Sequence, residues 1–210
     1  MEGRTERVKS EKVYAHIHFD RTPDPHESTS NPNIISIDAL ADQEPLKKLR
    51  GITDFSPLFL GITWSTSPEP LGEVGLSVNK LVAWTQESGG PIGKYSGLKQ
   101  VSLVSRKDTL DRKSFDMHYL NHVNIARSHH GMEKYAQNID IEHLYGPQPK
   151  SSAIDGISEL WFADESDWFH RFYLHEDSQR VVREDTQNFI DFQTTSSIMV
   201  AETRFRRIEK

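Results

Sequence analysis

The order of strand and helix patterns in the C-terminal half constrains the fold more than any other feature of this sequence. Four segments alternate apolar and polar residues as strands do, and two are rich in helix formers. The strand patterns cover residues 98–107, 132–145, 153–165 and 195–205, and the helix patterns cover residues 112–130 and 165–191. The order β-α-β-β-α-β predicts an α+β domain of the ferredoxin-like type, in which two helices cover one face of a four-stranded antiparallel sheet.

Local signals set the limits of these elements. Asp108 or Asp111 is a candidate N-cap of the first helix, and Gly131 ends it. In the second helix pattern, Asp177 or Ser178 is a candidate start of a new helical turn. We therefore expect one long helix and one interrupted helix.

A glycine-rich stretch divides the chain nearly in half. The segment ESGGPIGKYSGLK, residues 87–99, reads as a linker or wide turn because glycine frees the backbone and proline breaks regular structure. It predicts an N-terminal lobe over residues 1–94 and a C-terminal domain over residues 95–210.

The N-terminal lobe has a less legible pattern. Residues 12–20 and 56–66 are typical of strands, residues 35–50 are helix-like, and residues 77–87 suit either structure. The lobe is long enough to hold a second, degenerate ferredoxin-like copy.

Composition limits the classes of partner. Of the 210 residues, 35% are hydrophobic, which is enough to bury a core, and the net charge is −6. A negative charge argues against nucleic acid or an anionic membrane as the main partner. The chain has no cysteine, so thiolate chemistry and disulfides are excluded. It has neither a secretory signal pattern nor a run of about 18 apolar residues, so we expect a cytoplasmic protein.

Several motifs stand out in the C-terminal half. An aromatic-bearing helix with a histidine contains Phe115 and His122, and a Gly-x-x-x-Tyr entry into the second strand contains Gly131 and Tyr135. Asp-Gly-x-x-Glu-Leu-Trp-Phe follows on the third strand at 155–162, and Phe-Ile-Asp follows the second helix at 189–191. Together these motifs resemble the pattern of the EthD family of dimeric α+β barrels, and the resemblance covers about residues 98–206.

The resemblance implies a sheet whose open face pairs with another sheet to close a barrel. The partner sheet would come from a second copy, as a homodimer, or from the N-terminal lobe of the same chain. The superfamily includes cofactor-free isomerases, decarboxylases, dehydratases and cyclases. It therefore implies a small-molecule substrate, a cyclic or aromatic-derived carbonyl compound, and no cofactor.

One helical stripe carries most of the candidate site. In residues 112–130 a spacing of 4-3-4-3 places one set of side chains on a single face: Phe115, Tyr119, His122, Ala126 and His129. A set of two histidines and a tyrosine at this spacing is similar to that of the muconolactone-isomerising members. The expected catalytic residues are His122, His129, Tyr135 and Glu159, and the expected substrate-binding residues are Phe115, Tyr119 and Trp161.

The chemistry expected of this set is proton transfer next to a carbonyl group. Imidazole titrates near neutral pH and suits this transfer, while a tyrosine hydroxyl can steady an enolate oxygen. The structural alternative is that the inward histidines are hydrogen-bonded core residues and the tyrosines pack. His118 and His130 point elsewhere on the helix and are expected at the surface.

Glu159 has two interpretations. It alternates with Ile157 and Trp161, so it either projects into a barrel or cleft, where burial would raise its pKa, or pairs across strands with Lys134 or Arg204. The raised pKa would let it act as an acid or base.

One metal-like pattern is the pair His16 and His18, which fall on one face of a strand. His118 and His122 have helical i, i+4 spacing, but no further ligand motif follows them. Two histidines are weak evidence, and we predict no metal. Two hypotheses therefore stand: a cofactor-independent EthD-like enzyme, or a non-catalytic ligand-binding or accessory protein. A cofactor-free monooxygenase on the same fold is a weaker variant of the first.

Overall fold

A computed structural model describes residues 10–27, 30–86, 92–147 and 153–205. The N-terminal lobe contains β1 (Ser10–His18), β2 (Ile34–Leu40), α1 (Glu44–Arg50), β3 (Gly61–Ser65) and β4 (Val74–Thr85). The strands of the C-terminal half are β5 (Gly93–Lys94), β6 (Leu98–Val104), β7 (Lys134–Tyr145), β8 (Gly156–Phe162) and β9 (Ser196–Arg204). Its helices are α2 (Arg112–His129), α3 (Glu165–Arg171) and α4 (Ser178–Thr186).

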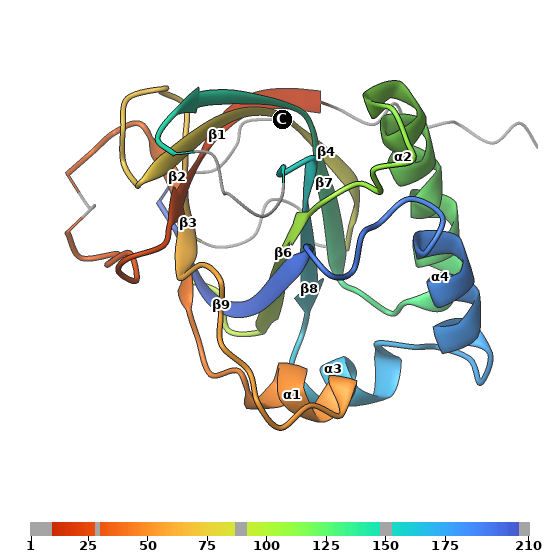
Figure 1. Cartoon of the computed structure of the whole chain (residues 1–210). Helices are drawn as coiled ribbons and strands as arrows, with labels where there is room; N and C mark the ends of the chain where they lie inside the picture. The colour runs from red at the N-terminus through yellow and green to blue at the C-terminus, as the bar shows by residue number, and fades with distance from the viewer. Residues whose placement is uncertain (1–9, 28–29, 87–91, 148–152, 206–210) are drawn as a thin grey trace, which may run out of the picture.

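Eight strands close into an antiparallel barrel (Figure 1). The order around the ring is β2-β3-β1-β4-β7-β8-β6-β9, and β9 pairs again with β2. The short β5 pairs with β9 just beyond the end of the β6 pairing. Closure leaves no open sheet edge within the ring, which is how an antiparallel sheet buries its second face.

The two lobes have the same strand order. In each lobe the second strand lies beside the third, the third beside the first, and the first beside the fourth. The fourth strand of each lobe then pairs with the second strand of the other, as β4 with β7 and β9 with β2. This arrangement is consistent with two ferredoxin-like lobes, as in the dimeric α+β barrel, so the predicted fold class is confirmed. A homodimer stays a prediction.

The C-terminal half follows its sequence pattern closely. Asp111 caps α2 by accepting a hydrogen bond from the Ser114 amide at 2.7 Å, and the helix ends at His129, beside Gly131. The interrupted helix is also confirmed, because α3 and α4 are separate and Asp177 is the N-cap residue of α4.

The helix expected over residues 35–50 is confirmed only at its end, and its first part is wrong. Residues 34–40 form β2, and only residues 44–50 are helical. The β-branched residues at 34, 35 and 37 favour a strand, and pairing with β3 and β9 outweighs the helix-like spacing. Residues 77–87, which suited either structure, fall mostly in β4.

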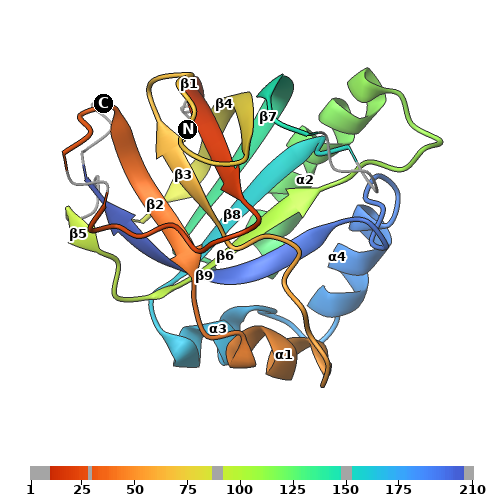
Figure 2. The ribbon, with the colours of Figure 1, turned by 60° about the vertical axis from the view of Figure 1, so that its left-hand side comes forward.

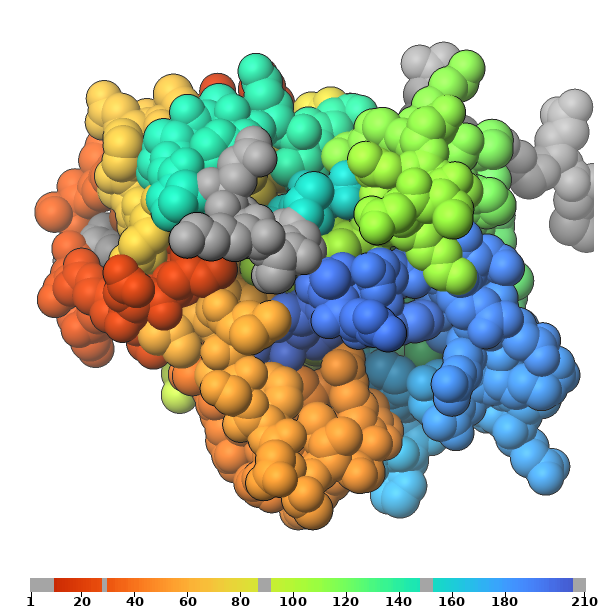
Figure 3. Space-filling model, in the orientation of Figure 1, coloured from red at the N-terminus to blue at the C-terminus, as the bar shows by residue number. Residues whose placement is uncertain are grey.

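The helices lie outside the barrel. Figure 2 shows α2 and α4 on one flank of the C-terminal sheet and α1 beside α3 below it. In the surface view the blue residues around α4 lie against the green residues that lead into α2 (Figure 3). The indole of Trp168 in α3 donates to the backbone oxygen of Pro45 in α1 at 3.0 Å, which ties the two lobes together.

The main apolar core fills the barrel. It joins strands from all around the ring, and its members include Val13, Ile17, Trp64, Leu76, Val101, Ile157 and Ile198. Further apolar clusters lie between the C-terminal sheet and its helices. The C-terminal sheet therefore has two buried faces, one toward the barrel interior and one toward the helices.

Part of the predicted linker, residues 87–91, lies outside the described residues. Lys94 and Gly93 of that linker form β5, and its last two residues begin β6. The division of the chain at residue 94 stays a prediction. Within the described residues, no helix is both long and apolar enough to span a membrane.

Candidate functional site

The C-terminal sheet separates the predicted site residues into two groups. Successive side chains of β8 point to opposite faces, so Ser158 and Leu160 face the helices, while Glu159 and Trp161 face the barrel interior. The helix side holds Phe115, Tyr119, His122 and Tyr135. Glu159 therefore lies on the opposite face of the sheet from His122, and the structure does not bring these two predicted residues together.

His122 is the centre of the group on the helix side. It is on the buried stripe of α2, and its Nδ1 lies 2.6 Å from the Oδ2 of Asp185 in α4. Phe189 packs against its ring. Its Nε2 has no hydrogen-bond partner among the described residues. A carboxylate on Nδ1 holds the imidazole in the tautomer whose Nε2 carries a lone pair.

Two tyrosine hydroxyls lie in the same layer. Tyr119 bonds to Ser158 at 2.6 Å, and Tyr135 accepts from the amide of Gln137 at 3.1 Å. Burial raises the pKa of Tyr119 well above its ordinary value and raises the pKa of Tyr135 to about 12. Both hydroxyls therefore stay protonated at neutral pH and can donate hydrogen bonds.

The other histidines of the region have separate environments. The Nδ1 of His129 lies 3.0 Å from the hydroxyl of Ser178 at the start of α4, and its ring meets the edge of His175. His130 was expected at the surface, but it is buried and bonds to the backbone oxygen of Phe172. His118 is exposed, as expected.

Inside the barrel, Glu159 belongs to a network of buried charges. Its carboxylate lies 2.6 Å from the ammonium group of Lys80 and 2.8 Å from that of Lys99. Lys99 also contacts Asp38 at 2.8 Å and Glu202 at 3.0 Å. Lys134 and Arg204 were the predicted partners of Glu159. Among the described residues, its ion pairs are with Lys80 and Lys99 instead.

The expected raised pKa of Glu159 is also wrong. Burial alone would raise the pKa, but the neighbouring charges of Lys80 and Lys99 hold it well below its usual range. Burial raises the pKa of Asp38 to about 6, although the neighbouring charge of Lys99 acts in the opposite direction. Glu159 is thus a fixed anion that stabilises two cations, a role unlike that of a general acid.

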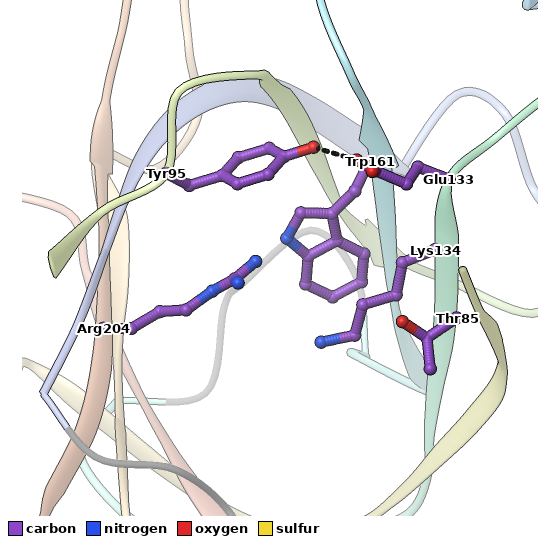
Figure 4. Close-up of a pocket in the computed structure, with 6 residues that line it drawn as sticks. All are labelled: Thr85, Tyr95, Glu133, Lys134, Trp161 and Arg204. Atoms are coloured by element: carbon purple, nitrogen blue, oxygen red, sulfur yellow. Dashed lines mark hydrogen bonds between the residues drawn. The ribbon is translucent and has the colours of Figure 1, made fainter. Parts of the chain in front are cut away.

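A small pocket opens next to this network. It is a narrow crevice lined by Thr85, Tyr95, Glu133, Lys134, Trp161 and Arg204 (Figure 4). Tyr95 donates a hydrogen bond to Glu133 at 2.7 Å, and Arg204 is held by Glu202 at 2.6 Å. Trp161, an expected substrate-binding residue, is the aromatic wall of this pocket.

The pair His16 and His18 lies on the outer face of β1. His16 bonds to Ser65 at 2.7 Å and to Tyr145 at 2.6 Å, and His18 bonds to Thr63 at 2.9 Å. Among the residues that the structure describes, no group of three or more histidine, aspartate or glutamate side chains is placed to hold a metal ion.

Sequence reasoning missed Asp185 and two lysines of the barrel, Lys80 and Lys99. A signal for Asp185 exists, because α4 buries Ser178 and Val182 and the residue seven positions after Ser178 falls on the same face. Its pairing with His122, 63 positions away, depends on the packing of α4 on α2. For Lys99, the alternation of β6 with Val101 and Leu103 gives the direction of the side chain.

The comparisons identify the C-terminal half. Residues 107–193 match the family model of the EthD domain, a stretch that contains α2, β7, β8, α3 and α4. The family expected from the motifs in residues 98–206 is therefore confirmed for that half. No curated protein matches the chain.

Proposed function

Since residues 107–193 of this chain are an EthD domain, we propose that the protein is a cofactor-independent enzyme that moves a proton next to a carbonyl group. The substrate class is a small cyclic or aromatic-derived carbonyl compound. The observation that carries the proposal is the contact of 2.6 Å between His122 and Asp185, in one layer with the hydroxyls of Tyr119 and Tyr135.

The proton transfer would start at His122. Its Nε2 takes the proton from the carbon next to the carbonyl group, and the electron pair of the broken bond moves to the carbonyl oxygen. The carboxylate of Asp185 stabilises the imidazolium that forms. A protonated tyrosine, Tyr119 or Tyr135, donates a hydrogen bond to the enolate oxygen.

The same enolate leads to several reactions. Return of the proton to another carbon gives isomerisation, and its delivery to a leaving hydroxyl gives dehydration. A decarboxylation passes through the same enolate and takes the proton up again at carbon. His129 is an auxiliary candidate, since its bond to Ser178 links the end of α2 to the start of α4.

The proposal is tested by hydrogen exchange at carbon. The full chain is incubated in heavy water with a panel of lactones, cyclic enones and anthrone-like ketones, and deuterium uptake next to the carbonyl group is measured by mass spectrometry. We expect uptake that depends on the protein, reduced about a hundredfold or more in His122→Ala and about tenfold to a hundredfold in Asp185→Asn.

His118→Ala is the matched control, because His118 lies on the same helix but is exposed. It should leave the exchange rate unchanged. If His122→Ala exchanges deuterium as fast as the unchanged protein, the proposal is wrong.

The second candidate is a non-catalytic ligand-binding or accessory protein. The bond of His130 to a backbone oxygen favours it, because a histidine used in this way supports the core. In that case compounds of the panel would raise the melting temperature without any deuterium uptake.

A further inference from the structure

The barrel interior contains two ion pairs that join the lobes. The ammonium group of Lys80 on β4 lies 2.6 Å from the carboxylate of Glu159 on β8. The ammonium group of Lys99 on β6 lies 2.8 Å from the carboxylate of Asp38 on β2. All four side chains are buried, so water and salt screen these charges little. Each pair has one member in each lobe and therefore forms only when the lobes meet.

The shared strand order gives each of these residues a counterpart in the other lobe. Where β2 meets β9, Asp38 is paired with Glu202, and where β4 meets β7, Lys80 is paired with Asn138. Exchange of the two lobes converts the first of these strand pairs into the second. Asn138 is therefore the counterpart of Asp38, and Glu202 is the counterpart of Lys80.

The pairing inside each lobe extends this correspondence to the third strands. Ile62 on β3 is paired with Asp38, and Ile157 on β8 is paired with the counterpart of Asp38. Two residues further along these strands, Trp64 corresponds to Glu159. The first strands, aligned by their pairing with β3 and β8, make Val13 the counterpart of Lys99. Each charged residue thus has a counterpart that is neutral or of opposite charge.

A ring built from two C-terminal domains would lose both pairs. Glu202 of the second copy would take the place of the lysine on β4, so Glu159 would face a carboxylate. Asn138 of the second copy would take the place of Asp38, so Lys99 would face a neutral amide. Removal of one partner from a buried ion pair leaves an uncompensated charge, which is strongly unfavourable.

The remaining ion pairs of the network lie within the C-terminal lobe. Lys99 also contacts Glu159 at 2.8 Å and Glu202 at 3.0 Å, and Arg204 contacts Glu202 at 2.6 Å. These contacts can form whichever partner closes the ring. The difference between the two partners therefore depends on the contacts that cross from one lobe to the other.

Complementary charges give an interface its specificity, because a wrong partner presents like charges or none. We propose that the charges inside the barrel select the partner of the C-terminal sheet and favour the N-terminal lobe over a second C-terminal domain. A C-terminal domain without that lobe still has open sheet edges, so the charges set the preference between partners and not the pairing itself. The selection does not depend on the proposed function, because His122 lies on the other face of the sheet.

The preference is measured on the whole chain after the connection between the lobes is cut. A protease recognition sequence is inserted within residues 87–91, and the cleaved protein is unfolded in urea and refolded by dilution. The cut is needed because a covalent connection raises the effective concentration of the N-terminal lobe far above that of a second copy. Native mass spectrometry then gives the ratio of the complex of both lobes to the C-terminal dimer. We expect the complex of both lobes to predominate about tenfold or more.

Lys80→Glu combined with Asp38→Asn gives the N-terminal lobe the two side chains that a second C-terminal domain would present. We expect this double variant to lower the ratio about tenfold or more, the factor that close charge pairs across an interface supply. Lys80→Met and Asp38→Asn each remove one pair with little change in size, and each should lower the ratio about threefold or more. The two single variants decide the question if the double variant does not refold.

Lys12→Glu combined with Asp20→Asn is the matched control, because it makes the same change in charge at two exposed positions of the N-terminal lobe. It should leave the ratio unchanged. The proposal is overturned if neither single variant lowers the ratio, or if the control lowers it as much as the double variant does. Refolding of the cleaved, otherwise unchanged protein mainly into C-terminal dimers would overturn it as well.

Discussion

Two buried histidines lie outside the proposed catalytic pair. His16 on the outer face of β1 and His130 at the end of α2 both have their pKa lowered to about 4, chiefly because burial disfavours the charged ring. In the unfolded chain their pKa is near 6.5. The unfolded state therefore binds more protons between pH 4 and 6.5, and each histidine stabilises the fold fully only above that range.

We predict that acid weakens the fold well above the range in which exposed carboxylates titrate. The contribution of each histidine to the free energy of unfolding falls by about 2 kcal/mol between pH 7 and 5. Asp38 acts in the opposite direction. Its pKa is raised to about 6 in the folded protein, so protonation of this carboxyl between pH 7 and 5 stabilises the fold. The sum is a free energy of unfolding about 2 kcal/mol lower at pH 5 than at pH 7, measured by urea denaturation.

Replacement of the histidines checks the cause. His16→Gln and His130→Gln should each flatten the dependence on pH, although both lower the stability at pH 7. A free energy of unfolding that is equal or higher at pH 5 would contradict the interpretation.

At the scale of the element, α2 positions the proposed site through its first turn. The carboxylate of Asp111 accepts a hydrogen bond from the amide of Ser114, a bond that also lowers the pKa of Asp111. The same helix carries His122 on its buried stripe and ends at His129, shortly before β7 and Tyr135.

We predict that Asp111→Ala lowers the free energy of unfolding, because an N-terminal amide of α2 loses its partner. Asp111→Ser keeps an acceptor and should lose less than half as much. Urea denaturation measures both variants, and equal losses would show that the cap is not the cause.

At the scale of the whole molecule, each lobe supplies what the other lacks. The C-terminal sheet has edges at β7 and β9, and the N-terminal lobe covers them with β4 and β2. Inside the ring, the core joins Val13 and Trp64 of one lobe with Val101 and Ile198 of the other. Neither sheet buries its inner face alone.

We therefore predict that residues 95–210, produced alone, associate with a second copy. The exposed β7 of one copy would pair with β9 of the other, and the two sheets would close a ring. Light scattering after size exclusion should give twice the mass of the fragment. A monomer with the near-ultraviolet circular dichroism of a packed domain would contradict the prediction.

Much of the fold was predictable from particular residues. The stripe from Phe115 to His129 with a cap at Asp111 predicts α2, and the alternation of Ile157, Glu159 and Trp161 predicts β8 with its correct faces. Residues 35–43 were misread because a short amphipathic segment has no decisive period, and contacts with β3 and β9 settle its state.

The candidate site was predictable only in part. His122, Tyr119 and Tyr135 were found from spacing, and they do lie in one layer. The partner of His122 and the charge balance around Glu159 were not found, because Asp185, Lys80 and Lys99 lie on other elements.

The sequence by itself determined the local structure and the direction of side chains, because helix and strand periods depend on neighbouring residues. Only the tertiary structure decided which of these side chains meet. Closure of the ring brought Lys80 from the N-terminal lobe against Glu159, and the packing of α4 on α2 set Asp185 against His122. Contacts of this kind join residues tens of positions apart, and their charge states follow from burial and from neighbours that no local pattern contains.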